Sequence, residues 1–118
     1  MYSAQVIDHF EHPRNVGEME RPSASARVEN PACGDVMELA VRVSEGRITE
    51  VRFRTKGCVT AIACGSLLTE LLRGRSVSEA LNLRRQELVD ALGGLSNETM
   101  HGSHLAMDAL QAVLRSLP

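Results

Sequence analysis

The sequence contains no tryptophan, few other aromatic residues and no excess of charge of either sign. Aromatic residues make up 3% of the 118 residues, and 13 Lys and Arg are balanced by 15 Asp and Glu, giving a net charge of −2. We therefore expect no nucleic-acid binding, because neither a basic surface nor a row of rings for base stacking is available. The apolar runs are far shorter than the roughly 20 residues that span a bilayer, so we expect no membrane association.

The start of the chain also lacks the basic segment and apolar stretch of a secretory signal peptide, and it carries Asp8 and Glu11 instead. We therefore expect a cytoplasmic protein. The three cysteines, Cys33, Cys58 and Cys64, are an odd number, which rules out a fully paired intrachain disulfide framework. In a reducing cytosol such cysteines bind metals, take part in catalysis or are simply buried.

Length and hydrophobic patterning predict a single α+β domain over residues 1–118. Alternating apolar residues predict strands over 37–43 and 51–56, joined by a turn at Glu45-Gly46, and a weaker strand over 26–29. Helical spacing predicts helices within residues 3–12, 59–73, 76–83, 86–92 and 106–117. Strands followed by helices predict a small antiparallel β-sheet of about three strands with helices packed on one face.

Two short segments offer cysteine ligands where secondary structure begins. Cys33 and Asp35 precede the clearest strand, and Gly34 between them can adopt backbone angles closed to other residues, so both side chains can turn toward one point. The alternative is a turn with an incidental cysteine. Cys58 lies where a strand changes to a helix, and exposed N–H groups at a helix start favour the thiolate. The alternative is a buried, small apolar residue.

Three further residues are candidates for the same chemistry. His101 lies at or just before the start of the last helix, where it is either a neutral imidazole ligand or a helix cap. His104 is three residues further on and is kept as a substitute ligand. Cys64 shares a helix face with Leu68 and Leu71, which favours a core position, although it also remains a candidate substitute ligand or sulfur acceptor.

Arg52, Arg54 and Lys56 alternate along one predicted strand and therefore lie on one of its faces. Such a row is typical of a solvated outer face of a sheet. A docking face for an acidic partner is the alternative.

Taken together, Cys33, Asp35, Cys58 and His101 provide two soft ligands, one hard ligand and one of intermediate character. Each lies at the end of an expected element, where a sheet edge and two helix starts can meet. This set of donors suits a zinc ion or an iron–sulfur centre.

Four sequence motifs follow one another along most of the chain. They are HFEHPRNVG at His9–Gly17, NPACGDVM at Asn30–Met37, Gly57-Cys58 with Ala-Ile-Ala at 61–63, and MHGSHLA at Met100–Ala106. Together these motifs resemble the iron–sulfur cluster scaffold family of IscU, SufU and the N-terminal domain of NifU.

The resemblance implies an α+β scaffold or carrier, not an enzyme, on which a [2Fe–2S] cluster is assembled and then passed on. It implies that Cys33, Asp35, Cys58 and His101 bind the cluster or iron, or Zn²⁺ in the isolated protein. A hard carboxylate matches a soft iron–sulfide centre poorly, so the bond from Asp35 should be labile and favour release. The implied partners are a cysteine desulfurase, an iron or electron donor and apo-proteins that accept the cluster.

The sequence departs from the family pattern at two places. Gly102 replaces the family's third cysteine, which is a ligand and, in well-studied members, the acceptor of persulfide sulfur. Residues 96–99, Ser-Asn-Glu-Thr, replace the Leu-Pro-Pro-Val-Lys segment that a dedicated Hsp70-type chaperone binds in IscU proteins, so chaperone-assisted release is not expected.

The missing cysteine leaves several alternatives open. Cys64 or His104 could replace it, two chains could share a cluster as a homodimer, or Cys33, Asp35, Cys58 and His101 could complete a four-coordinate site unaided, which is the hypothesis we favour. The rival functions are a zinc-binding regulator or sulfur relay for a cysteine desulfurase, and a degenerate, metal-free interaction module.

Overall fold

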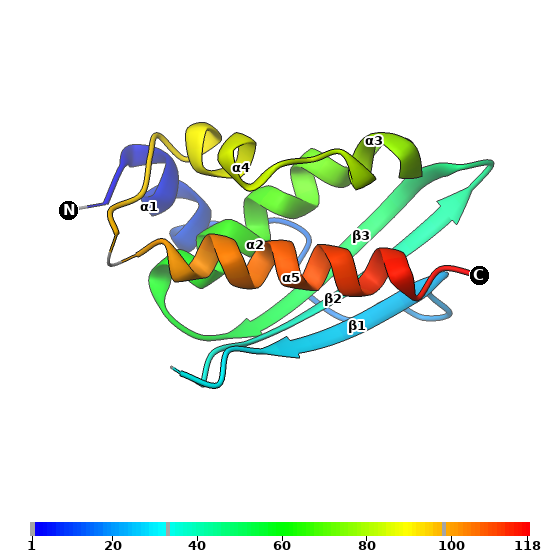
Figure 1. Ribbon diagram of the computed structural model, residues 1–118, viewed down its shortest axis with the longest axis horizontal. Coiled ribbons are helices and arrows are strands. Elements are labelled where there is room, and N and C mark those ends of the chain that lie inside the picture. Colours follow the sequence, from blue (N-terminus) through cyan, green and yellow to red (C-terminus); the bar gives the residue numbers. More distant parts are fainter. Residues whose placement is uncertain (1, 33, 98) are drawn as a thin grey trace.

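The computed structural model of the protein describes residues 2–32, 34–97 and 99–118. Its elements run in the expected order, with a helix, three strands and then four more helices among the described residues (Figure 1). They are α1 (Ala4–Glu11), β1 (Ala24–Glu29), β2 (Val36–Ser44), β3 (Arg47–Lys56), α2 (Val59–Leu72), α3 (Val77–Leu81), α4 (Arg85–Ala91) and α5 (His101–Arg115). The predicted α+β class is confirmed.

The three strands form an antiparallel sheet in the order β1-β2-β3. Strand β2 is central, and its residues Met37, Leu39 and Val41 are buried on one face while the intervening residues are less so. The turn between β2 and β3 has Glu45 and Gly46 at φ of 52° and 77°. Two consecutive positive φ angles match the twist of a tight hairpin, which lets β3 begin at Arg47, four residues before the sequence pattern indicated.

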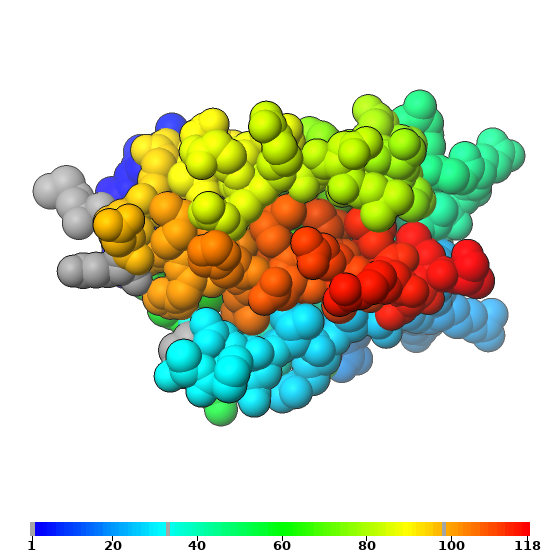
Figure 2. Space-filling model, viewed as in Figure 1, coloured from blue at the N-terminus to red at the C-terminus, as the bar shows by residue number. Residues whose placement is uncertain are grey.

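The helices cover one face of this sheet. Helix α2 packs on β3 and α5 packs on β1 and β2 (Figure 1). In Figure 2, α5 runs between β1 on one side and α3 and α4 on the other. The core lies between the sheet and the helices α2 and α5. Within the described residues, none of the helices combines the length and apolar character that a bilayer crossing requires.

Side-chain capping fixes the starts of two helices. The hydroxyl of Ser3 accepts a hydrogen bond from the Val6 N–H at the start of α1. At α3, Ser76 and Glu79 form a reciprocal capping box. Each cap satisfies N–H groups that the first helical turn leaves without a partner.

The segment after α1 is anchored to both α2 and the sheet. The backbone N–H of Arg14 donates to the Ser66 hydroxyl at 2.9 Å, and the side-chain amide of Asn15 donates to Thr69 Oγ1 at 3.0 Å. Asn15 and Gly17 also form backbone hydrogen bonds with Phe53 in β3. The first family-like motif therefore holds α1 and its loop against the scaffold.

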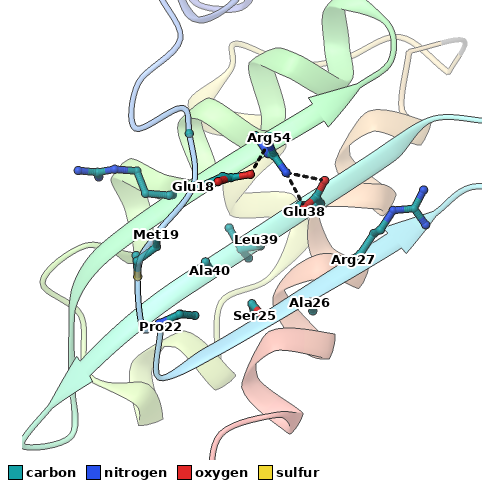
Figure 3. Close-up of a pocket in the computed structure, with 12 residues that line it drawn as sticks. Glu18, Met19, Pro22, Ser25, Ala26, Arg27, Glu38, Leu39, Ala40 and Arg54 are labelled. Atoms are coloured by element: carbon teal, nitrogen blue, oxygen red, sulfur yellow. Dashed lines mark hydrogen bonds and ion pairs between the residues drawn. The ribbon is translucent and has the colours of Figure 1, made fainter.

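The outer face of the sheet carries paired charges (Figure 3). Arg54 lies 2.9 Å from a carboxylate oxygen of Glu18 and 3.2 Å from one of Glu38, its cross-strand neighbour. Arg52 lies 3.0 Å from a carboxylate oxygen of Glu50. These ion pairs favour the solvated sheet face over a docking face for an acidic partner, because both arginines already have acidic neighbours.

Substituting Gly65 by alanine should destabilise the protein, because α2 lies directly on the sheet at this residue. An added Cβ would be 2.6 Å from two carbons of the Phe53 ring and 3.1 Å from Met37 Cε. We expect overpacking to lower the free energy of unfolding by about 1–3 kcal/mol, against a gain of about 1 kcal/mol in helix propensity. Urea denaturation measures the change, with the exposed Gln111→Ala as control. A Gly65→Ala protein that is more stable than wild type by about the 1 kcal/mol of helix propensity would contradict the close packing.

His9 should make stability depend on pH. It is buried between α1 and α2, with Nδ1 2.7 Å from the Ser66 hydroxyl, and burial followed by the nearby Arg14 cation lowers its pKa below 6.5. Because the unfolded state then binds the proton more tightly, the contribution of His9 is complete above about pH 6.5 and is lost as pH falls through the folded-state pKa.

The measurement compares wild type with His9→Gln by urea denaturation across this pH range. The free energy of unfolding of wild type minus that of His9→Gln should be constant above about pH 6.5 and should become smaller below it. The matched control is His12→Gln at the exposed end of α1. A wild-type stability that falls no faster than that of His9→Gln on acidification would show that His9 is not held in its neutral form.

Candidate metal centre

Asp35 is placed by a tight loop between β1 and β2. The N–H of Asn30 donates to the Asp35 carbonyl at 2.8 Å, and the N–H of Gly34 donates to the Asn30 carbonyl at 2.7 Å. Gly34 has a φ of 77°, the left-handed conformation that glycine adopts without steric cost. The loop thus sets the largely buried Asp35 carboxylate at the start of β2, on the side of α2.

Cys58 is the second residue of the two-residue link between β3 and α2. It is the N-cap of α2, in extended conformation and half-buried, and its side chain makes no capping hydrogen bond. Its backbone N–H points to Asp35 Oδ2 at 3.5 Å. The preceding residue is Gly57, where an added Cβ would lie 2.8 Å from the Asp35 carboxyl carbon. Glycine at this position lets the carboxylate approach the start of α2.

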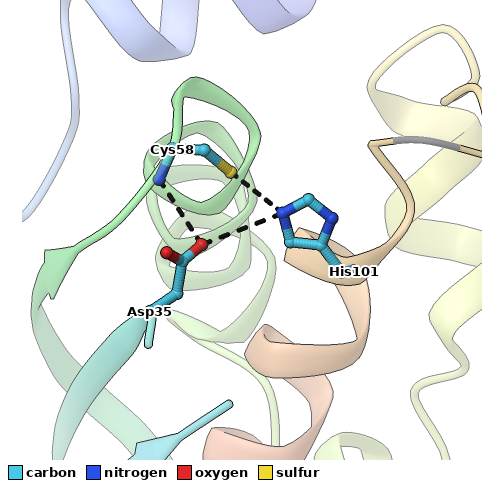
Figure 4. A group of neighbouring side chains, drawn as sticks. All are labelled: Asp35, Cys58 and His101. Carbon is cyan, nitrogen blue, oxygen red and sulfur yellow. Dashed lines mark hydrogen bonds and ion pairs between the residues drawn. The ribbon is translucent and has the colours of Figure 1, made fainter. Parts of the chain in front are cut away.

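His101 is the first residue of α5, and its ring completes the group (Figure 4). Its Nε2 atom is 3.2 Å from Cys58 Sγ and 3.8 Å from Asp35 Oδ2. A loop end, a helix N-cap and a helix start therefore contribute one side chain each. All three ligand atoms lie within 4.8 Å of one another.

The spacing of these atoms fits a single metal ion. Zinc bonds of 2.0–2.3 Å in tetrahedral geometry place neighbouring ligand atoms about 3.3–3.7 Å apart. His101 Nε2 is 3.2 Å from Cys58 Sγ and 3.8 Å from Asp35 Oδ2, so the two distances lie just below and just above that range. Thiolate, imidazole and carboxylate are also a donor set that zinc and iron accept. The group could therefore hold a metal with small side-chain adjustments.

Of the other predicted site residues, Cys33 lies outside the described residues. Cys64 is fully buried in the core of α2, and His104 is exposed on α5. Among the described residues, neither of these two belongs to the group formed by Asp35, Cys58 and His101. The structure therefore gives no support to Cys64 or His104 as replacement ligands, because core packing holds one away and the helix turns the other toward solvent.

Two glycines are features of this site that sequence reasoning undervalued. Gly57 permits the approach of Asp35, and its place between a strand and a cysteine was the available signal. Gly102 is buried where the first turn of α5 meets the first turn of α2, and an added Cβ would be 2.9 Å from the Ala61 nitrogen. From the sequence alone, Gly102 was noted only as the residue that replaces the family's third cysteine.

The fold and the site together define a small α+β protein that carries, at one end of its sheet, a group of side chains that could bind a metal ion. The family model described as "NifU-like N terminal domain" matches residues 1–117. The chain belongs to this family.

Curated relatives agree with this assignment. An iron–sulfur cluster assembly scaffold protein IscU from Archaeoglobus fulgidus is 45% identical over 114 residues, covering 97% of this chain and 74% of the relative. The IscU scaffold protein of Escherichia coli is 44% identical over 117 residues, covering 96% and 91%. The suspected resemblance to the scaffold family is confirmed.

Solved structures share the fold. The N-terminal part of a nitrogen-fixing NifU-like protein from Brucella abortus superposes with a TM-score of 0.79 at 15% identity, covering 98% of this chain and 92% of that one. A scaffold protein described as putative, for the SUF system of Fervidobacterium islandicum, gives a TM-score of 0.66 at 19% identity and covers 98% and 93%. At these identities the likeness concerns the fold.

Alkylation should distinguish Cys58 from Cys64. Burial raises the pKa of the Cys64 thiol to about 12, whereas Cys58 is half-buried at a helix start. Because the thiolate is the reactive form, iodoacetamide should label Cys58 in the folded, metal-free protein and Cys64 only after denaturation. Peptide mass spectrometry measures both rates. Equal rates in the folded protein would contradict the placement of Cys64 in the core.

Proposed function

We propose that the protein is a scaffold or carrier for iron–sulfur clusters, on which a [2Fe–2S] cluster is held and then passed to apo-proteins. The observation that carries this proposal is the convergence of Asp35, Cys58 and His101 at one end of the sheet. Membership of the NifU-like N-terminal domain family and relatives named as IscU scaffold proteins support it. The cluster is the cargo, and the protein is a carrier, not an enzyme.

Each side chain has a role that follows from its chemistry. Cys58 supplies a soft thiolate and His101 an imidazole nitrogen, both suited to iron. Asp35 supplies a hard carboxylate, which binds an iron–sulfide centre weakly and can leave first. A site with one weak ligand can give up its cluster more easily than a site of four thiolates.

Cys33 is proposed as the fourth ligand. It stands two residues before Asp35, and Gly34 between them has the left-handed conformation that tightens this loop. With Cys33, the chain would offer four ligands without drawing on Cys64 or His104. A zinc ion could occupy the same set in the isolated protein.

The proposed function implies partners and a location. A cysteine desulfurase would supply sulfur, and an iron or electron donor would supply iron or electrons. Apo-proteins would accept the finished cluster. The proposed site of action is the cytoplasm. No chaperone of the Hsp70 type is included, because residues 96–99 lack the Leu-Pro-Pro-Val-Lys segment.

Anaerobic reconstitution tests the proposal. Purified protein is incubated with Fe²⁺, cysteine, a cysteine desulfurase and dithiothreitol, which reduces the persulfide sulfur to sulfide, and iron, acid-labile sulfide and the visible spectrum are measured. Wild type should become brown with equal iron and sulfide. Asp35→Ala, Cys58→Ala and His101→Ala should each hold less cluster, because each removes a ligand.

The chain offers matched controls for two of these variants. His104→Ala alters an exposed histidine on the same helix as His101, and Cys64→Ala alters a cysteine on the same helix as Cys58. Both should retain the cluster. Loss of cluster in Cys64→Ala with an unchanged Asp35→Ala protein would refute the ligand set.

The outcome for wild type also separates the rival functions. A colourless protein that keeps about one Zn²⁺ per chain, as expected for one tetrahedral site, and resists reconstitution would favour a zinc-binding regulator or sulfur relay for a desulfurase. A protein that binds neither metal nor cluster would favour a degenerate interaction module.

A further inference from the structure

The first turns of α2 and α5 are in unusually close contact at Gly102. An ideal Cβ on Gly102 would lie 2.9 Å from the Ala61 nitrogen, 2.9 Å from the Thr60 carbonyl carbon and 3.0 Å from Thr60 Cγ2. Two of these three atoms are backbone, so no change of rotamer can make room. Glycine is therefore required for the two helices to approach this closely.

This contact lies beside the metal-ligand group on both helices. His101 directly precedes Gly102 on α5, and Cys58 is the N-cap two residues before Thr60 on α2. Moving the α5 start away from the α2 start along this contact would therefore move the His101 ring away from the Cys58 thiol, which are now 3.2 Å apart. Bringing the Cβ contact from 2.9 Å to an ordinary 3.4 Å requires the helices to separate by about 0.5 Å.

We infer that Gly102 is a positioning residue, which holds His101 against Cys58 by letting α5 pack directly on the first turn of α2. It follows that the geometry of the centre depends on the absence of a side chain at residue 102. A cysteine introduced by Gly102→Cys therefore does not act as an additional ligand. The Cβ of the new cysteine would lie 2.9 Å from two backbone atoms of α2, so the start of α5, which carries His101, would have to move before the thiol could reach the centre. This inference rests on the proposed role of Asp35, Cys58 and His101 as ligands.

Cobalt binding tests the inference with a spectroscopic readout. Co²⁺ is titrated anaerobically into reduced, metal-free wild type, Gly102→Ala and Gly102→Cys, and the ligand-field and sulfur-to-cobalt charge-transfer bands are recorded. Both variants should bind Co²⁺ about tenfold or more weakly, in the range found when groups that orient metal ligands are altered. Their ligand-field bands should also weaken as tetrahedral coordination is lost.

A variant that loses stability elsewhere on α5 controls for indirect effects. Ala109 is buried two turns further along the helix, and Ala109→Gly destabilises α5 without adding volume. It should lower the melting temperature yet keep the wild-type Co²⁺ affinity and spectrum. If Ala109→Gly weakens binding as much as Gly102→Ala does at equal loss of stability, the inference is wrong.

A measurement on wild type covers the case in which the Gly102 variants fold poorly. A strong nuclear Overhauser effect is expected between the Gly102 α-protons and the Ala61 amide proton, in both the metal-free and the Zn²⁺-loaded protein. Its absence from either form would overturn the inference.

The outcomes distinguish this inference from the proposed function. If wild type binds no Co²⁺, both fall together. If wild type binds Co²⁺ and Gly102→Ala binds it equally well, or if Gly102→Cys binds it more tightly with stronger charge-transfer absorption, the positioning role is wrong while the proposed metal centre stands.

Discussion

The structure depends most on the packing of two helix starts against each other over the end of a small sheet. Helices α2 and α5 meet at Gly102, with backbone atoms of Thr60 and Ala61 where a side chain would otherwise lie. This contact joins the end of the sheet to the last helix, although the chain between the two helices passes through α3 and α4. It thereby brings His101 to Cys58, which lies 43 residues earlier in the sequence.

The sheet and the segments packed on it hold the two helix starts and the three side chains in position. The antiparallel sheet fixes where β3 ends, and so where Cys58 begins α2. The β1–β2 loop carries Asp35 to the same end of the sheet. Buried apolar residues of α2 and α5 pack on the sheet, and the segment Arg14–Gly17 is hydrogen-bonded to both α2 and β3. Rigid packing of this kind suits a site whose ligands come from three separate elements.

Sequence patterns were sufficient for most of the fold because each pattern has a local cause. Alternation along β2, the caps at Ser3 and Ser76, and the apolar face of α5 each follow from interactions within a few residues. The start of β3 was placed too late, since the tight turn at Glu45-Gly46, not hydrophobic alternation, carries the pairing to Arg47. The convergence of Asp35, Cys58 and His101 was anticipated from element ends and from family-like motifs, but the distances between their atoms could not be predicted from the sequence. The role of Gly102 was also beyond reach, since a glycine carries no side-chain signal and its meaning lies in what packs against it.

The central claim is that Asp35, Cys58 and His101 bind one metal centre together. X-ray absorption at the zinc edge of the Zn²⁺-loaded protein tests it most directly. The account predicts a mixed shell with sulfur near 2.3 Å and nitrogen or oxygen at about 2.0–2.2 Å, together with imidazole multiple scattering that disappears in His101→Ala. A shell of sulfur alone, or imidazole scattering that persists in His101→Ala and disappears in His104→Ala, would contradict it.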